Sequence, residues 1–220
     1  MALMDAIKAK AKADVKHIVL AEGTEPRTVE AAGIIAKEGL AKVTLLGDVD
    51  EIKKVAAGKS LEGVNLIDPE KQANFDEYVN DFYEMRKKKG MTPEKARETM
   101  KNTLYYATMM IKKGAADGMV AGAINSTGNT IRPALQIIKT APGISIVSSC
   151  FLMEVPDKSY GDNGVLVFGD CAICINPSAE ELAAIAAASA ATGKALAGID
   201  PRIAMLSFST KGSAKHELVD

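Results

Sequence analysis

The chain has 220 residues, 47% of them hydrophobic and 25% charged, and its 27 Lys and Arg residues against 28 Asp and Glu residues give a formal net charge of −1. These values are typical of a folded chain of one large or two small domains and exclude an intrinsically disordered one. They also argue against nucleic acid as the main partner, because duplex binding needs many unpaired basic side chains that neutralise phosphates.

The cysteine count and the apolar segments indicate a cytoplasmic protein without membrane contact. Cys150, Cys171 and Cys174 are too few for a disulfide scaffold, and their odd number is typical of a reducing compartment. No apolar stretch near the N-terminus has the length of a secretory signal core. The longest apolar-rich stretch, residues 182–191, falls well short of the roughly 20 residues that a membrane span requires.

The first 140 residues alternate between helical patterns and short apolar runs. Strands are predicted at residues 17–21, 42–47, 64–67 and 118–122. Helices are predicted at residues 3–13, from residue 26 onward, and at 49–57, 78–89, 93–100, 103–113 and 129–139. Because helical segments connect successive strands, the alternation predicts an α/β fold with mainly parallel sheets that helices cover on both faces.

Beyond residue 140 the pattern predicts a hairpin followed by one more helix and strand. Strands are predicted at residues 144–155, 165–169 and 203–207, the first two joined as an antiparallel hairpin by a turn-rich loop. Ser178-x-x-Glu181 is a capping box, and it begins a helix that runs to about residue 191.

Two α/β domains are expected, one of residues 1–145 and an incomplete one of residues 146–220. Few residues follow the last predicted strand, whereas a parallel βα unit requires a helix that covers this strand. The sequence therefore predicts that the chain is a fragment of a longer protein.

Common catalytic and cofactor motifs are missing from the sequence. It contains neither a Rossmann glycine fingerprint after a strand, nor G-x-x-x-x-G-K-[ST], nor H-E-x-x-H, and its two histidines argue against a histidine-based metal site. Cys171 and Cys174 form a C-x-x-C pair, but in a continuation of the strand at 165–169 they would point to opposite faces. We interpret them as packing residues rather than as a redox pair or zinc ligands.

Residues 122–133 combine a strand end, a loop of small and hydroxyl side chains, and the start of a helix. Ligands of open α/β sheets bind at the carboxyl ends of strands, and a helix N-terminus there offers free N–H groups to phosphate. Ser126 and Thr127 supply hydroxyl donors, and Arg132, expected in the first turn, supplies a bidentate guanidinium. An ordinary capped loop with a solvated arginine fits the same pattern equally well.

Two further segments place basic residues in comparable settings. Ser207, Ser209 and Lys211 follow the last predicted strand, where an anion site and a plain loop are equally compatible with the sequence. A basic run begins at Arg86 and continues to Lys89. Such a helical face is usually solvated, although it could screen the phosphates of a nucleotide-like ligand.

Segments along the whole chain carry a resemblance to a known enzyme family. The main ones are Ala-Asp-Gly-Met-Val-Ala-Gly-Ala at 116–123 and Asn-Thr-Ile-Arg-Pro-Ala-Leu-Gln at 129–136, with further agreement at 21–23, Arg27, 139–143, 167–172 and 204–213. In this order they resemble the phosphate acetyltransferase (phosphotransacetylase) family, the phosphate acetyl/butyryl transferases. Collinear agreement over nearly the whole chain is more specific than any single motif.

The resemblance implies an acyltransferase that moves an acetyl group between coenzyme A and inorganic phosphate. Coenzyme A is then a substrate, acetyl phosphate and phosphate are the other small-molecule partners, and no metal or permanently bound cofactor is expected. The implied fold has two α/β domains with the active site between them and is related to the isocitrate/isopropylmalate dehydrogenase fold. The complete protein is expected to be a cytoplasmic homodimer that binds neither nucleic acid nor membrane.

The family pattern also assigns residues. It implies that Arg132 and Arg86 are two arginines of the substrate-binding cleft. Cleft-lining loops are implied to contain Ser126, Thr127, Ser207, Ser209 and Lys211. The family's Ser-Arg pair, and the Asp thought to deprotonate the coenzyme A thiol, fall beyond Asp220. The chain is therefore expected to hold no catalytic residue and to be inactive on its own.

Other activities remain open at this point. A phosphate butyryltransferase would differ from the acetyl enzyme only in its acyl pocket. A non-catalytic regulatory domain would bind acyl-CoA without transferring the acyl group. A dehydrogenase of the related fold is less well supported, because the sequence shows no evident acidic metal cluster.

Overall fold

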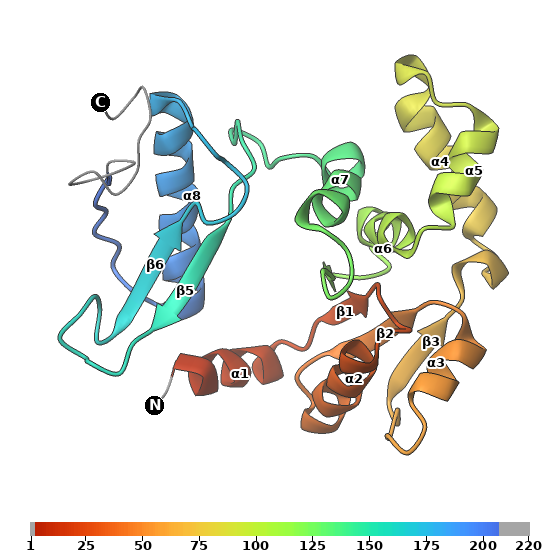
Figure 1. The fold of residues 1–220 in the computed structure, drawn as a ribbon, viewed down its shortest axis with the longest axis horizontal. Helices are drawn as coiled ribbons and strands as arrows, with labels where there is room; N and C mark the ends of the chain where they lie inside the picture. Colours follow the sequence, from red (N-terminus) through yellow and green to blue (C-terminus); the bar gives the residue numbers. More distant parts are fainter. Residues whose placement is uncertain (1–2, 207–220) are drawn as a thin grey trace. The chain divides into compact units, whose positions relative to one another are not determined.

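The computed structural model describes residues 3–206, which form two compact units. Residues 8–139 make up the first unit, and residues 3–7 together with residues 140–206 make up the second (Figure 1). Both units combine helices and strands, so the predicted α/β class is confirmed. A domain boundary at residue 145 stays a prediction.

Four parallel strands form the sheet of the first unit. In sheet order they are β3 (Val64–Ile67), β2 (Lys42–Leu46), β1 (His17–Leu20) and β4 (Gly118–Val120). Val19 of β1 lies opposite Thr44 of β2 and opposite Met119 of β4. The predicted parallel sheet is confirmed. Because β1 and β4 are neighbouring parallel strands, their carboxyl ends lie side by side at the same end of the sheet.

The helices of this part of the chain follow the predicted positions closely. They are α1 (Leu3–Ala13), α2 (Pro26–Glu38), α3 (Val49–Val55), α4 (Phe75–Arg86), α5 (Pro93–Met100), α6 (Thr103–Lys112) and α7 (Thr127–Ile137). Short 3-10 turns at Pro69–Lys71 and Lys87–Lys89 flank α4. The main differences are that α4 begins at Phe75 rather than residue 78, and that α7 begins at Thr127 rather than residue 129, because Ser126 caps it.

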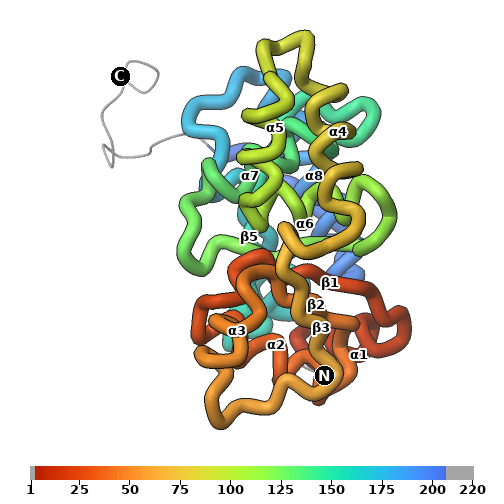
Figure 2. The backbone as a smooth tube through the Cα atoms, turned by 90° about the vertical axis from the view of Figure 1, so that its right-hand side faces the viewer, coloured from red at the N-terminus to blue at the C-terminus, as the bar shows by residue number. Residues whose placement is uncertain are grey.

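The two faces of the sheet bury different side chains. Leu20 and Leu45 pack against α2 and α3, whereas Val19 and Leu46 pack against α4, α5, α6 and α7 (Figure 1). Adjacent residues of one strand thus enter opposite layers, as the two-residue period of a strand requires. Helices cover both faces, as the βα alternation predicts, and α4 and α5 lie side by side in one layer (Figure 2).

Helix α6 is the most deeply buried helix segment of this layer. Its buried residues are Leu104, Tyr106, Ala107, Thr108, Met109 and Met110. The Tyr106 hydroxyl donates a hydrogen bond to Asn74 Oδ1 at 2.8 Å. Burial raises the pKa of Tyr106 to about 12, so this phenol stays neutral and keeps its hydrogen bond.

The second unit contains a hairpin and a long helix. Strand β5 (Cys150–Glu154) pairs antiparallel with β6 (Val165–Gly169), which confirms the predicted hairpin. Helix α8 (Ala179–Ala197) begins at the predicted capping box, where Ser178 and Glu181 satisfy each other's backbone N–H groups. It ends at Gly198 in the left-handed conformation, beyond the predicted end, because its alanine-rich sequence continues to favour a helix.

Two predicted strands are wrong in part. Residues 144–149 lie outside β5, because the five residues of β6 pair with residues 150–154 alone. Residues 203–206 form no strand, since no other described segment provides them with a ladder of hydrogen bonds. Residue 207, the last of that predicted strand, lies outside the described residues.

A buried carboxylate joins the ends of β1 and β4. Glu22 follows β1 and is 5% exposed. Its Oε2 accepts hydrogen bonds from the N–H groups of Gly122 and Ala123 at 2.9 and 2.7 Å. Its Oε1 accepts from the N–H groups of Ile124 and Asn125 at 3.1 and 2.9 Å and from Asn125 Nδ2 at 2.8 Å. The carboxylate therefore fixes the loop that leads into α7.

The pKa of Glu22 reflects these contacts. Burial by itself raises the pKa, but the hydrogen bonds from the Asn125 side chain and from the backbone N–H groups lower it to about 2. Hydrogen bonds to the ionised form are strong in a buried site, and here they outweigh desolvation. Glu22 is consequently ionised throughout the physiological pH range.

Helix α2 approaches the segment before β3 closely at Gly33, and a side chain at this position should destabilise the fold. A Cβ atom at Gly33 would lie 2.4 Å from the carbonyl oxygen of Ser60. In Gly33→Ala, the gain in helix propensity of about 1 kcal/mol is outweighed by the backbone clash, which costs roughly 2–3 kcal/mol. We expect a lower urea midpoint by circular dichroism, whereas Gly128→Ala, with open space around the site, should be unchanged or more stable. Equal stability of Gly33→Ala would contradict this close approach.

The variant Glu22→Gln should be less stable than the wild type. The neutral amide keeps the shape but cannot accept all five hydrogen bonds, so the free energy of unfolding should fall by about 3 kcal/mol at pH 7. The Glu22 pKa is depressed from 4.5, so its stabilisation is fully present above that pH and is lost as pH falls toward 2.

Chemical denaturation of both proteins from pH 7 to pH 2 measures this difference. The gap between wild type and Glu22→Gln should be constant above about pH 5 and should close below pH 4. The exposed carboxylate of Glu62 provides the matched control, and Glu62→Gln should leave stability nearly unchanged. A gap that does not depend on pH would rule out the ionised form as the source of the stabilisation.

Candidate functional site

Arg132 lies in the second turn of α7, not in its first turn as the sequence suggested. The helix begins at Thr127 because Ser126 Oγ accepts a hydrogen bond from the Asn129 N–H at 3.3 Å. Arg132 is exposed. Among the described residues, no carboxylate forms an ion pair with Arg132.

Arg86 is the last residue of α4. Its Nε is buried and has no hydrogen-bond partner in the described part of the chain. No carboxylate within residues 3–206 forms an ion pair with this guanidinium either. A buried donor without an acceptor is costly, and it is the kind of group that a bound anion would satisfy.

Tyr105 of α6 contacts both helices that carry the two arginines. Burial raises the pKa of Tyr105, while the positive charges of Arg132 and Arg86 both lower it, so both guanidiniums act on the same phenol. The Tyr105 hydroxyl donates a hydrogen bond to Gln136 Oε1 at 3.3 Å. Tyr105 contacts the helices that carry Arg86 and Arg132, and the sequence pattern did not indicate these contacts.

The loop before α7 offers fewer N–H groups than the sequence suggested. Those of Gly122 to Asn125 already bind Glu22. The N–H groups of Thr127 and Gly128 occupy the first two helical positions, where no intrahelical acceptor exists. Ser126 caps the helix through its oxygen and keeps its own hydroxyl proton for donation. Ser126 and Thr127 are both exposed at this end of α7.

Arg27 also supports this loop. Its Nε donates to Glu25 Oε1 at 2.6 Å, and its Nη2 donates to the carbonyl oxygen of Ala123 at 3.0 Å. Glu25 in turn caps α2. Arg27 therefore differs from Arg132 and Arg86, because its guanidinium is already engaged. The short Ala-Glu-Gly segment and Arg27 were quoted for the family resemblance, but their structural task was not apparent from the sequence.

The second unit contains a comparable carboxylate, Asp170, directly after β6. Its Oδ1 accepts from the N–H groups of Ser149 and Cys171 at 2.6 and 2.8 Å and from the Ser149 hydroxyl. Its Oδ2 accepts from the N–H groups of Ile173, at 2.9 Å, and Cys174. Burial raises the pKa of Asp170, but these hydrogen bonds outweigh burial and hold the pKa well below its usual range.

This arrangement corrects the expected setting of Cys171 and Cys174. Strand β6 ends at Gly169, so both cysteines lie in the loop around Asp170 and not in the strand. Burial and the negative charge of Asp170 raise the pKa of Cys174. A raised thiol pKa is the opposite of what a redox or nucleophilic cysteine requires. The interpretation of Cys174 as a packing residue is therefore consistent with its surroundings.

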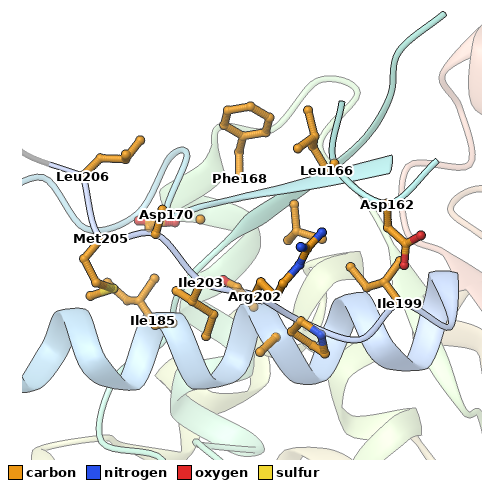
Figure 3. Close-up of a pocket in the computed structure, with 18 of the residues that line it drawn as sticks. Asp162, Leu166, Phe168, Asp170, Ile185, Ile199, Arg202, Ile203, Met205 and Leu206 are labelled. Carbon is orange, nitrogen blue, oxygen red and sulfur yellow. The ribbon is translucent and has the colours of Figure 1, made fainter. Parts of the chain in front are cut away.

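A cavity of about 540 Å³ lies between β6, α8 and residues 199–206 (Figure 3). Its lining is mainly aliphatic, with Leu166, Ile185 and Ile203 among the contributors, and the charged lining residues are Asp162, Asp170, Asp200 and Arg202. None of the predicted site residues in the described part of the chain lines it. The cavity therefore suits an apolar group better than a phosphate.

Three predicted site residues cannot be placed. Ser207, Ser209 and Lys211 lie outside the described residues. Within residues 3–206, no group of three or more His, Cys, Asp and Glu side chains has the arrangement of a metal site. In the same range, no helix has both the length and the hydrophobicity needed to cross a bilayer.

Known proteins similar to the chain include several named transferases. The curated phosphate acetyltransferase of Thermoanaerobacterium thermosaccharolyticum is 56% identical over 220 residues, which is 100% of this chain and 67% of that protein. The phosphate acetyltransferase of Acetivibrio thermocellus is 52% identical over 220 residues, again 100% of this chain and 66% of its own length. The chain thus spans about two thirds of the length of the curated relatives it matches.

Solved structures give a consistent result. A phosphotransacetylase from Streptococcus pyogenes has a TM-score of 0.86 and 44% identity, and the match covers 98% of this chain and 64% of that one. The EutD phosphotransacetylase from Staphylococcus aureus has a TM-score of 0.83 and 40% identity, with 98% and 63% covered. A relation to the isocitrate/isopropylmalate dehydrogenase fold stays a prediction.

A family profile described as phosphate acetyl/butaryl transferase matches residues 2–220. The match covers nearly the whole chain, and the two curated relatives named above are 56% and 52% identical to it. The segments quoted from the sequence, including those around Glu22 and Arg132, fall within this match. The chain therefore belongs to the phosphate acetyl/butaryl transferase family.

Proposed function

We propose that this chain supplies the anion-binding part of an enzyme that transfers an acetyl group between coenzyme A and inorganic phosphate. The observation that carries the proposal is that neither Arg132 nor Arg86 has a carboxylate partner within residues 3–206, and that the buried Nε of Arg86 has no hydrogen-bond acceptor there. The relatives named phosphate acetyltransferase support the choice of reaction. Because the chain spans about two thirds of their length, the proposed activity refers to the whole protein.

The two guanidiniums suit a phosphoryl group for electrostatic reasons. A planar guanidinium binds two oxygens of a phosphate at once, and two such groups can neutralise most of its charge. Neither Arg132 nor Arg86 has to break an ion pair within the described residues before it binds an anion. Ser126, Thr127 and the first N–H groups of α7 add donors beside Arg132.

The proposed reaction is a direct acyl transfer. The thiolate of coenzyme A attacks the carbonyl carbon of acetyl phosphate, a C–S bond forms, and the C–O bond to phosphate breaks. Phosphate leaves with the electron pair of that bond, and positive charge beside it stabilises the transition state. A free thiol has a pKa near 8.5, so deprotonation needs a base or a positive field. Coenzyme A enters as a substrate and not as a resident cofactor.

Glu22 and Asp170 are poor choices for the base that accepts the thiol proton. Hydrogen bonds from nearby N–H groups hold the pKa of both carboxylates far below the neutral range. The oxygens of both are also occupied by several donors. A base with a pKa near the working pH is required. We therefore expect the 220-residue chain alone to lack acetyl transfer.

The acyl group, a non-catalytic alternative, and the location and oligomeric state of the whole protein complete this proposal. The family name includes both acyl groups, so butyryl phosphate is the alternative acyl substrate. A non-catalytic acyl-CoA-binding domain is the second candidate, since the arginine pair would bind coenzyme A without catalysis. A cytoplasmic location and a homodimeric whole protein are carried over from the family resemblance.

Isothermal titration calorimetry of the chain with coenzyme A, acetyl phosphate and NADP tests the proposal. We expect coenzyme A and acetyl phosphate to bind and NADP not to bind. Arg132→Ala should weaken both by roughly 30-fold or more, because a charge-assisted contact is worth about 2 kcal/mol. Arg132→Lys should restore little of this loss, since an ammonium cannot replace the planar guanidinium.

Arg97 provides the matched control for a lost arginine. Arg97 is paired with Asp76 and lies over the Phe75 ring. Neither of these residues is a contact partner of Tyr105, which packs against Phe82 and donates a hydrogen bond to Gln136. Arg97→Ala should therefore leave the affinity for coenzyme A unchanged. Unchanged affinity in Arg132→Ala, or tighter binding of NADP than of coenzyme A, would contradict the proposed function. Binding of coenzyme A without acetyl phosphate would favour the non-catalytic domain.

A further inference from the structure

Tyr105 lies between the two helices that carry the site arginines. Its ring packs edge-on against Phe82 of α4, with the ring centroids 5.5 Å apart and the planes at 71°. Its hydroxyl donates a hydrogen bond to Gln136 Oε1 of α7 at 3.3 Å. A single side chain of α6 therefore contacts both α4 and α7.

Each of these contacts lies one helical turn from an arginine. Phe82 precedes Arg86 by four residues in α4, and Gln136 follows Arg132 by four residues in α7. Residues four positions apart share one face of an α-helix. Tyr105 therefore touches the same helix faces that carry the two guanidiniums.

The charges around Tyr105 agree with this geometry. Arg132 and Arg86 are the two charged groups that act on its hydroxyl, and burial nevertheless keeps the pKa of Tyr105 above its ordinary value. Tyr105 is therefore a neutral phenol at physiological pH and can donate its hydrogen bond. A neutral phenol does not neutralise the charges of Arg86 and Arg132, and it does not compete with an anion for them.

We propose that Tyr105 is a positioning residue that sets the separation and orientation of Arg86 and Arg132 for one anionic ligand. The ring holds α4 through Phe82, and the hydroxyl holds α7 through Gln136. These contacts fix the spacing of α4 and α7, and with it the backbone positions from which the two guanidiniums extend. A clamp on one phosphoryl group requires both at a fixed separation. This inference rests on the proposed function.

Tyr105→Phe is the direct test, because it keeps the ring against Phe82 and removes the hydroxyl. The dissociation constant of coenzyme A, measured by isothermal titration calorimetry of the 220-residue chain, should rise roughly 5- to 20-fold. Gln136→Met removes the acceptor at similar size and should have a comparable effect. The double variant should bind no more weakly than either single variant, since both break the same hydrogen bond.

Tyr106→Phe is the matched control on the same helix. It also removes a tyrosine hydroxyl from a hydrogen bond, here to Asn74, but this bond lies away from the arginines. We expect it to lower the melting temperature and to leave the dissociation constant unchanged. An equal loss of affinity in Tyr106→Phe would overturn the proposal, because Tyr105 would then have a merely structural role.

A double-mutant cycle with Arg132 shows whether Tyr105 acts through this arginine. In an Arg132→Ala background, Tyr105→Phe should cause no further loss, or a much smaller one, in affinity for coenzyme A. The same fold-loss in both backgrounds would overturn the proposal, as would an unchanged dissociation constant in Tyr105→Phe alone. If Arg132→Ala itself has no effect on coenzyme A binding, the proposed function fails instead.

Discussion

Five hydrogen-bond donors converge on the carboxylate of Glu22, and four of them are consecutive backbone N–H groups. A turn of this kind leaves its N–H groups pointing to one side, where they need an acceptor. The carboxylate supplies that acceptor from the end of β1, which the sheet holds beside β4. The contact thereby fixes the loop at residues 122–125, which leads into the Ser126 cap of α7.

The first unit contains four arginines, and two of them have a carboxylate partner among the described residues. Arg27 binds Glu25, and Arg97 binds Asp76. Arg86 and Arg132 lack such a partner among the described residues, and the positive charge of each lowers the pKa of Tyr105. Unpaired like charges destabilise a fold modestly, and a bound anion removes that penalty.

Local patterns were sufficient to predict most of the fold. The apolar runs identified the parallel strands, and the capping box at Ser178 identified the start of α8. Arg132 and Arg86 were assigned as site residues by the family resemblance, and this assignment stays a prediction. Residues 144–149 were predicted as strand because they are apolar, yet strand formation depends on a partner whose length no local pattern gives.

The tasks of Glu22, Asp170 and Tyr105 were not predictable from local sequence. The groups that bind Glu22 are about 100 positions away in the chain, and no spacing rule links an acidic residue after one strand to a loop after another. Tyr105 looks like one more aromatic residue of a buried helix. Its contacts with α4 and α7 depend on how three helices pack, which is a tertiary property.

The loop around Asp170 has a consequence for the chemical reactivity of the chain. The Cys174 Sγ faces the carbonyl oxygen of Val147 at 3.4 Å, and the nearby Asp170 charge disfavours its thiolate. The thiolate, not the thiol, is the nucleophile that attacks an alkylating reagent, so this cysteine should react slowly at neutral pH. A cysteine introduced at an exposed position, for instance on α5, would therefore accept a fluorescent maleimide with little background from Cys174.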